Sequence, residues 1–122
     1  MNIEAEMTKA ELGPFDQAEI SLDQTLNIRA AGTYLVRVEG DSMQGAGIFS
    51  GDLLIVDKAI EAKAGNIIIA VIDGEPMCKR LEFTSGMPLL RSENRRYPPR
   101  YVLETEEFSI WGVVTHSLRD HN

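Results

Sequence analysis

Two uninterrupted apolar runs constrain the fold of this chain more than any other feature. Residues 53–56 and 66–72 are rich in isoleucine, leucine and valine, as strands buried on both faces of a sheet are. Gly51-Asp52 and Gly65-Asn66 are turn signals before the two runs, and Asp73-Gly74 after the second run predicts a hairpin. The sequence therefore predicts a mainly β fold built from many short strands.

Shorter patterns extend this prediction along the chain. Residues 33–39 alternate and place Tyr34, Val36 and Val38 on one face of a strand. Further strands are expected at residues 89–90, 101–103 and 108–115. We therefore expect residues 33–122 to form a single β domain.

Residues 1–32 are polar and weakly patterned, and we expect them to form a short, mobile regulatory arm. A helix is predicted within residues 1–12 and ends at Gly13-Pro14. A second, weaker helix is predicted at residues 22–28.

Composition narrows the function classes. The chain has 122 residues, of which 43% are hydrophobic, and this is enough for one core. Its net charge of −7 argues against non-specific DNA binding through the whole surface, and we expect no direct sequence-specific DNA binding. The single cysteine suits a reducing cytosol, and neither a signal peptide nor an apolar run of roughly 18 residues is present. A cytoplasmic protein without a membrane span is expected.

Ser42 is the candidate nucleophile. It lies in Gly40-Asp41-Ser42-Met43, at the end of a strand-like run, where a turn can present its hydroxyl without crowding. Glycine, aspartate and serine are also favoured in turns for local reasons, so the motif alone leaves a purely structural role open.

A serine nucleophile needs a group that takes its proton, and Lys79 is the candidate. The two histidines, His116 and His121, both lie at the C-terminal end and fit no Ser/His/Asp order. Alternation along residues 75–83 puts Lys79 on an apolar face, shared with Met77, Leu81 and Phe83. Burial there would lower the pKa of the lysine so that the neutral amine can act as a base. The alternative is a lysine that reaches the rim of the core and stays charged.

The sequence gives little support for a metal site, a phosphate-binding loop, or catalysis by aspartate or cysteine. One cysteine and two C-terminal histidines give no zinc-ligand spacing, and residues 40–51 lack the Gly-Lys-Ser/Thr ending of a phosphate-binding loop. No metal or other cofactor is therefore expected. Asp41, Asp52 and Asp57 adjoin turns or strand ends, where aspartate is common for local hydrogen bonding, and Cys78 is interpreted as a packing residue.

A basic segment interrupts the acidic chain. Its arginines are interleaved with tyrosines: Arg91, Arg95, Arg96, Tyr97, Arg100 and Tyr101. Three interpretations are open, namely a solvated loop, a contact with another protein, and stacking on single-stranded nucleic acid.

Several ordered blocks over residues 33–116 resemble the UmuD and LexA family of self-cleaving Ser-Lys proteins of the bacterial SOS response. The blocks are Gly40-Asp41-Ser42-Met43, residues 51–57, Asp73-Gly74-Glu75, Lys79-Arg80-Leu81, then Leu90, Asn94, Tyr97 and Pro98, and finally Trp111-Gly112-Val113-Val114. The separation of Ser42 and Lys79 also fits the family pattern.

This resemblance implies both a fold and a mechanism. The fold would be the compact, twisted β-fold of the UmuD protein and the LexA C-terminal domain. Ser42 would be the nucleophile, Lys79 the general base, and the backbone N–H of Met43 a donor to the oxyanion.

The resemblance also implies a biological role and partners. The protein would be a homodimer and the regulatory subunit of an error-prone translesion polymerase, similar to the Y-family polymerase UmuC. A RecA filament on single-stranded DNA would activate self-cleavage. Two alternatives are a short-form adaptor that binds the polymerase without cleavage, and a phage-type repressor fragment without its DNA-binding domain.

The cleaved bond is the point where the chain departs from the family. Family members cut an Ala-Gly or Cys-Gly bond in the arm, whereas the bond at a suitable distance here is Leu12-Gly13. Ala31-Gly32 has the family dipeptide but lies only 11 residues before Ser42, because 42 − 31 = 11. We therefore expect cleavage, where it occurs, at Leu12-Gly13.

Overall fold

The computed structural model describes residues 21–122, and the chain divides into two units, Met1–Ala30 and Ala31–Asn122. In the first unit, α2 spans Leu22–Leu26 and ends at Asn27, whose left-handed backbone (φ 58°) closes the last turn. Arg29 and Asp23 form an ion pair within this unit. The helix expected within residues 1–12 and the Leu12-Gly13 bond lie outside the described residues.

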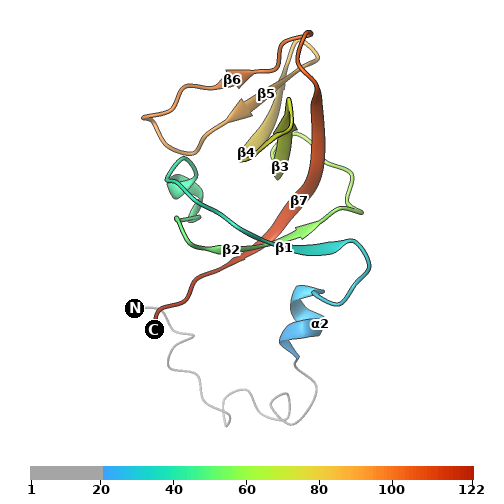
Figure 1. The fold of residues 1–122 in the computed structure, drawn as a ribbon, viewed down its shortest axis with the longest axis vertical. Helices are drawn as coiled ribbons and strands as arrows, with labels where there is room; N and C mark the ends of the chain where they lie inside the picture. Colours follow the sequence, from blue (N-terminus) through green and yellow to red (C-terminus); the bar gives the residue numbers. More distant parts are fainter. Residues whose placement is uncertain (1–20) are drawn as a thin grey trace. The chain divides into compact units, whose positions relative to one another are not determined.

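The second unit is a single antiparallel sheet in the order β1-β2-β7-β3-β4-β5-β6 (Figure 1). The strands are β1 (Thr33–Arg37), β2 (Leu53–Asp57), β3 (Ile67–Ile72), β4 (Glu75–Thr84), β5 (Met87–Arg91), β6 (Arg100–Tyr101) and β7 (Phe108–Leu118). A short 3-10 turn, η3 (Gln44–Ala46), lies between β1 and β2. The predicted mainly β fold is confirmed.

The two apolar runs form the centre of the sheet. The runs become β2 and β3, and every apolar side chain of these two strands is buried or half-buried. Ile68 packs in a first core cluster with Leu81 and Leu90, whereas its neighbour Ile69 packs in a second with Met43 and buried side chains of β2. Successive residues of β3 thus bury opposite faces, as predicted for these strands.

The long strand β7 joins the two halves of the sheet. In Figure 1 it runs from the group β3 to β6 down to the pair β1 and β2. Its pairing with β2 and with β3 shifts register once each, so Thr115 and Trp111 are extra residues on β7. Such bulges bend a strand and increase its twist, and they let one strand serve both halves.

The β3–β4 hairpin places β4 in the sheet. Asp73 (φ 49°) and Gly74 (φ 82°) both have left-handed backbones, as a two-residue type I′ turn requires. The hairpin predicted from Asp73-Gly74 is therefore confirmed. The next hairpin uses Ser85 (φ 52°) and Gly86 (φ 77°) in the same way and leads into β5.

Two aromatic side chains that share a strand face with partly buried residues are themselves exposed. Tyr34 is 46% exposed although Val36 and Val38 are half-buried, because β1 is an edge strand and Tyr34 lies at its outer end, where its ring packs on Trp111. Phe83 is 50% exposed because it lies next to the Ser85-Gly86 turn, beyond the core.

Asp52 has a long-range partner that the sequence did not reveal. Its carboxylate is 2% exposed and accepts hydrogen bonds from the Phe49 N–H and the Arg119 guanidinium. These bonds lower the pKa of Asp52. The Arg119 guanidinium also lies 4.0 Å from the centre of the Phe49 ring. The segment after β7 is thereby tied to the turn that precedes β2.

Gly112 lies on β7 at a point where the packing leaves no room for a side chain. A Cβ atom there would lie 2.5 Å from Val56 Cγ1, and both residues are buried. We expect Gly112→Ala to lower the free energy of unfolding by about 1–3 kcal/mol through overpacking. Denaturant unfolding measures this change. Ser109→Ala, at an exposed position of the same strand, is the control and should stay within about 0.5 kcal/mol. A Gly112→Ala protein as stable as wild type would contradict this account.

Candidate functional site

Ser42 lies in a turn that is fixed by backbone hydrogen bonds at its base and by the packing of the next residue. The segment between β1 and β2 is closed at its base, where Val38 N–H donates to the Asp52 carbonyl and Gly51 N–H to the Val38 carbonyl. Met43, next to Ser42, is 2% exposed and packs in the second core cluster. The serine itself is half-buried. The buried Met43 side chain therefore anchors the turn, while the Ser42 hydroxyl faces a neighbouring strand.

That strand is β4, and it brings Lys79 to Ser42. Lys79 is half-buried, and its Nζ donates to Ser42 Oγ at 2.9 Å. Its neighbours on the same strand face are Met77, half-buried, and Leu81, fully buried. Burial lowers the pKa of Lys79 from its ordinary value. The structure thus brings together two residues that lie 37 positions apart.

Ser92 is the third member of the hydrogen-bonded group that contains Ser42 and Lys79. It was not identified as a functional residue from the sequence. It follows β5, is 9% exposed, and its Oγ accepts a second hydrogen bond from Lys79 Nζ at 2.9 Å. It lies within the basic segment 91–101, for which a solvated loop was one of the three interpretations left open. A signal was present, because the Ser85-Gly86 turn sets a register that pairs Arg80 with Arg91 and points to Lys79 and Ser92 as the next facing residues.

The segment after β5 clamps the Ser42 turn on both sides. Before Ser42, the Asp41 carbonyl accepts from Asn94 Nδ2 at 2.9 Å, and the Asp41 carboxylate accepts from the Tyr97 hydroxyl. The hydrogen bond to Asp41 raises the pKa of Tyr97. After Ser42, Gly45 N–H donates to the Glu93 carbonyl at 2.7 Å. A Cβ at Gly45 would lie 2.5 Å from that carbonyl oxygen, so this approach requires glycine.

The oxyanion donor predicted at Met43 has its N–H available. In the described part of the chain, no hydrogen bond uses the backbone N–H of Ser42 or of Met43. Two adjacent N–H groups next to the nucleophile are the usual construction of an oxyanion hole. The role of Met43 stays a prediction.

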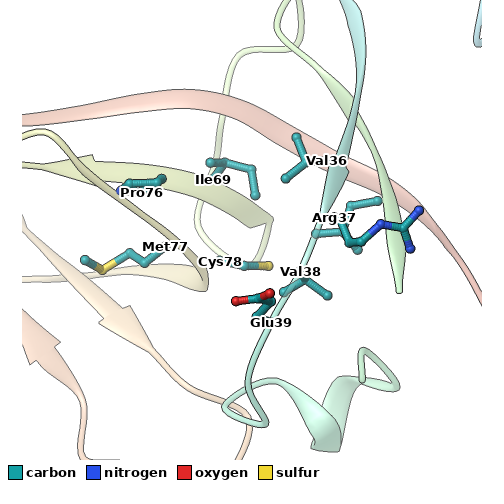
Figure 2. A pocket seen from close by; sticks show the side chains of 9 residues that line it. Val36, Arg37, Val38, Glu39, Ile69, Pro76, Met77 and Cys78 are labelled. Atoms are coloured by element: carbon teal, nitrogen blue, oxygen red, sulfur yellow. The ribbon is translucent and has the colours of Figure 1, made fainter. Parts of the chain in front are cut away.

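A cleft lies between the end of β1 and the start of β4 (Figure 2). It has a volume of about 380 Å³ and is mostly apolar. Its lining residues are Val36, Arg37, Val38, Glu39, Leu54, Ile69, Pro76, Met77 and Cys78. A smaller hollow of about 270 Å³ shares Val36, Ile69 and Pro76 with this cleft and extends to Trp111. Together they form an apolar groove that ends one residue before Lys79 and three before Ser42 along the chain.

Strands with unpaired backbone groups border this groove on both sides. Among the strands of residues 21–122, β1 pairs only with β2. β4 pairs with β5 only from Arg80 onward, so residues 75–79 have β3 as their one strand partner among the described residues. Such edges can accept an extended peptide as an additional strand.

The structure places the other residues considered in the sequence analysis outside the Ser42–Lys79 group. Cys78 packs against the second core cluster, and burial raises the pKa of its thiol to about 11, which makes it inert near neutral pH. Asp57 accepts from the Ala59 N–H in a local turn. His116 and His121 are both exposed. Within residues 21–122, no group of three potential metal ligands is placed to bind an ion, and no helix is long and apolar enough to cross a membrane.

Most arginines of the basic segment have acidic partners. Arg91 pairs with Glu82, Arg100 with Glu106, and Arg96 lies 3.5 Å from the Asp41 carboxylate. This neutralisation favours the interpretation as a solvated loop, with the added function of clamping the Ser42 turn. The segment also lines a hollow of about 560 Å³ beside Gln44 and Gly45.

The Ala31-Gly32 bond is held away from Ser42 of its own chain. Gly32 directly precedes β1, and its carbonyl accepts from Lys58 N–H at 2.8 Å. The paired strand between Gly32 and Val38 spans about 20 Å, at roughly 3.3 Å per residue. The bond therefore cannot reach Ser42 of the same chain while β1 is paired.

Known proteins are similar to this chain over most of its length. A family model described as Peptidase S24-like matches residues 3–115. The protein MucA of Salmonella typhimurium is 37% identical over 108 residues, which cover 88% of this chain and 73% of MucA. The protein SamA of the same species is 43% identical over 101 residues, which cover 83% of this chain and 69% of SamA. The LexA repressor of Bordetella pertussis is 41% identical over 86 residues, which cover 70% of this chain and 40% of the repressor.

These matches confirm the resemblance drawn from the sequence blocks. The family model covers the Ser42 turn, Lys79 and the clamping segment, and it extends into β7. The chain belongs to the Peptidase S24-like family.

Proposed function

We propose that this protein is a self-cleaving serine endopeptidase with a Ser42–Lys79 dyad. The observation that carries the proposal is the 2.9 Å separation of Ser42 Oγ and Lys79 Nζ in a half-buried site that lowers the pKa of the lysine. Lysine is an effective base only when neutral, and burial increases its neutral fraction. The similarity to LexA and membership of the Peptidase S24-like family support the same chemistry.

The steps follow from this arrangement. Neutral Lys79 Nζ takes the Ser42 hydroxyl proton while Oγ forms a bond to the carbonyl carbon of the scissile peptide. The N–H groups of Ser42 and Met43 stabilise the resulting oxyanion. The Lys79 ammonium then gives its proton to the departing amine as the C–N bond breaks. A water molecule, deprotonated by Lys79, hydrolyses the Ser42 ester and regenerates the hydroxyl.

The substrate segment is proposed to bind as an added strand in the groove. The unpaired edge of residues 75–79 ends at Lys79, so a peptide paired there would present its backbone to Ser42. The apolar lining would take side chains on one face of that peptide.

Leu12-Gly13 is the proposed scissile bond. Glycine after the cut lacks a side chain that the site must admit, and leucine suits an apolar groove. About 20 residues separate Gly13 from β1, and at roughly 3.3 Å each they span up to about 66 Å. This length is sufficient for the bond to reach Ser42 of the same chain or of a partner.

We further propose that the protein is a cytoplasmic homodimer and the regulatory subunit of a translesion polymerase of the UmuC type. The similarity to MucA and SamA over most of their length supports this role. A RecA filament on single-stranded DNA is the proposed activator. The apolar run 110–114 of β7 is one candidate edge for dimer formation, because Ile110 and Gly112 pair with β3 alone and Val114 pairs with β2 alone among the described strands. Further candidate edges are β1 and β6, which lie at the ends of the sheet.

Replacing the lysine tests the dyad. We expect Lys79→Ala to reduce self-cleavage by at least about 100-fold, because a general base contributes 10²–10⁴-fold. Lys79→Arg should be equally inactive, because arginine keeps its proton throughout the accessible pH range. Lys63→Ala, at an exposed position, is the control and should cleave like wild type. Intact mass over time measures each rate. Normal cleavage by Lys79→Arg would exclude Lys79 as the base.

The rate should depend on pH through Lys79. The active form is neutral, so the rate should rise tenfold per pH unit below the pKa of the lysine and level off above it. Because burial lowers this pKa, the midpoint should lie below the ordinary lysine value of about 10.4. A time course between pH 6 and pH 11 measures the midpoint. A rate that does not change with pH would contradict a lysine base.

The site of cutting can be read from fragment masses. We expect loss of residues 1–12, faster at pH 10 than at pH 7, accelerated at pH 7 by a RecA filament, and absent from Ser42→Ala. An intact chain under every condition would reject self-cleavage and leave the adaptor function. Ser42-dependent cutting at another bond would reject only the assignment of Leu12-Gly13.

A further inference from the structure

We propose that Ser92 is a positioning residue that directs the lone pair of Lys79 toward Ser42. Ser92 Oγ and Ser42 Oγ each lie 2.9 Å from Lys79 Nζ, and these two hydroxyls are the hydrogen-bond partners of Nζ within residues 21–122. The inference rests on the proposed function, because it assigns a role within that dyad.

The hydrogen-bond capacity of the amine explains why a second hydroxyl matters. A neutral lysine amine has two N–H donors and one lone pair, so it can accept from only one hydroxyl at a time. Rotation about the terminal C–N bond would otherwise let the lone pair point in several directions. When one N–H donates to Ser92 Oγ, that rotation is restricted, and the lone pair can face the Ser42 hydroxyl.

Ser92 is held firmly enough for this task. The β4–β5 ladder ends with Arg80 opposite Arg91, so Ser92 is the next residue along and lies across from Lys79 on the same face of the sheet. Directly facing residues of an antiparallel pair have Cβ atoms about 4.5–5.5 Å apart, which suits a short hydroxyl reaching an amine. Ser92 is buried, and the next residue, Glu93, is fixed by Arg80 through its carboxylate and by Gly45 through its carbonyl.

The charged and titratable surroundings of Lys79 come from three elements. They are Cys78 and Arg80 on β4, Asp41 on the Ser42 turn, and Glu93 and Tyr97 on the segment after β5. Asp41 is engaged by Tyr97 and Arg96, and Glu93 by Arg80, so neither carboxylate forms an ion pair with Lys79. Ser92 is therefore a neutral acceptor that stabilises the ammonium form of the lysine more than the amine form.

Loss of the Ser92 hydroxyl should have two opposite effects. Without this acceptor the pKa of Lys79 falls further, and the midpoint of the pH–rate profile moves to lower pH. Without the restricted rotation the plateau rate at high pH falls, by about 10- to 100-fold, as expected for a loosened catalytic geometry. A merely structural residue would change stability without moving the midpoint.

The matched pair Ser92→Thr and Ser92→Val separates the hydroxyl from packing, because the two side chains have nearly the same shape. We expect Ser92→Thr to keep the wild-type midpoint and most of the plateau rate, and Ser92→Val to show both effects. Ser92→Ala is the second hydroxyl-free variant, in case the larger side chains disturb the fold, and exposed Ser117→Ala is the control. An equal or higher plateau rate in both Ser92→Val and Ser92→Ala would overturn the proposal, since Ser92 would then be inert or would compete with Ser42 for the lone pair.

A second measurement works without cleavage. The pKa of Lys79 can be followed by NMR through the 13Cε chemical shift, in a Ser42→Ala background that cannot cut itself. We expect this pKa to be lower with Ser92→Val or Ser92→Ala than with Ser92→Thr. A lower pKa in a protein whose wild type never cleaves would keep the Ser92–Lys79 interaction and reject the proposed protease function. An unchanged pKa would overturn the role of Ser92 whatever the activity.

Discussion

The burial of Lys79 beside Ser42 is the interaction on which the rest of the site depends. The half-buried Lys79 amine, on a strand paired with β3, loses hydration, and its pKa falls because the charged form is penalised. The groups around Lys79 do little to stabilise its charged, ammonium form. Ser92 is neutral, and the carboxylates of Asp41 and Glu93 are occupied by other partners. The site therefore combines a close hydrogen bond with little compensation for the lysine charge.

This arrangement requires the two halves of the sheet to be connected with precision. Ser42 follows β1, which belongs to the half that β2 completes, whereas Lys79 and Ser92 belong to the β3–β4–β5 half. The two bulges of β7, with Gly112 between them packed against Val56, set the bend between these halves. The clamp from Asn94 and Tyr97 to Asp41 then fixes the Ser42 turn against the second half. Stability of the strand core and geometry of the site are thus coupled.

The sequence predicted local features well and long-range ones poorly. The apolar runs and the Asp73-Gly74 turn identified β2, β3 and the β3–β4 hairpin, because these depend on neighbouring residues. Alternation along β4 placed Lys79 on a partly buried face, and the Gly40-Asp41-Ser42-Met43 turn made Ser42 a candidate, but the pairing of the two rested mainly on the family resemblance. The exposure of Tyr34 was not predictable without knowing that β1 is an edge strand. The Asp52–Arg119 pair joins residues far apart in the chain and has no local pattern. The position of Ser92 across from Lys79 could have been predicted from the register of the β4–β5 hairpin, but its hydrogen bond to Lys79 could not.

Reaction of Ser42 with a fluorophosphonate tests the central claim most directly, because it depends neither on the arm nor on its cleavage site. An activated serine oxygen attacks phosphorus and expels fluoride, and peptide mapping by mass spectrometry locates the adduct. If Lys79 activates Ser42, a single adduct forms on Ser42, faster as the pH rises, and Lys79→Ala abolishes it. Labelling of Ser42 at the same rate in Lys79→Ala, or equal labelling of exposed serines such as Ser109 and Ser117, would contradict the account.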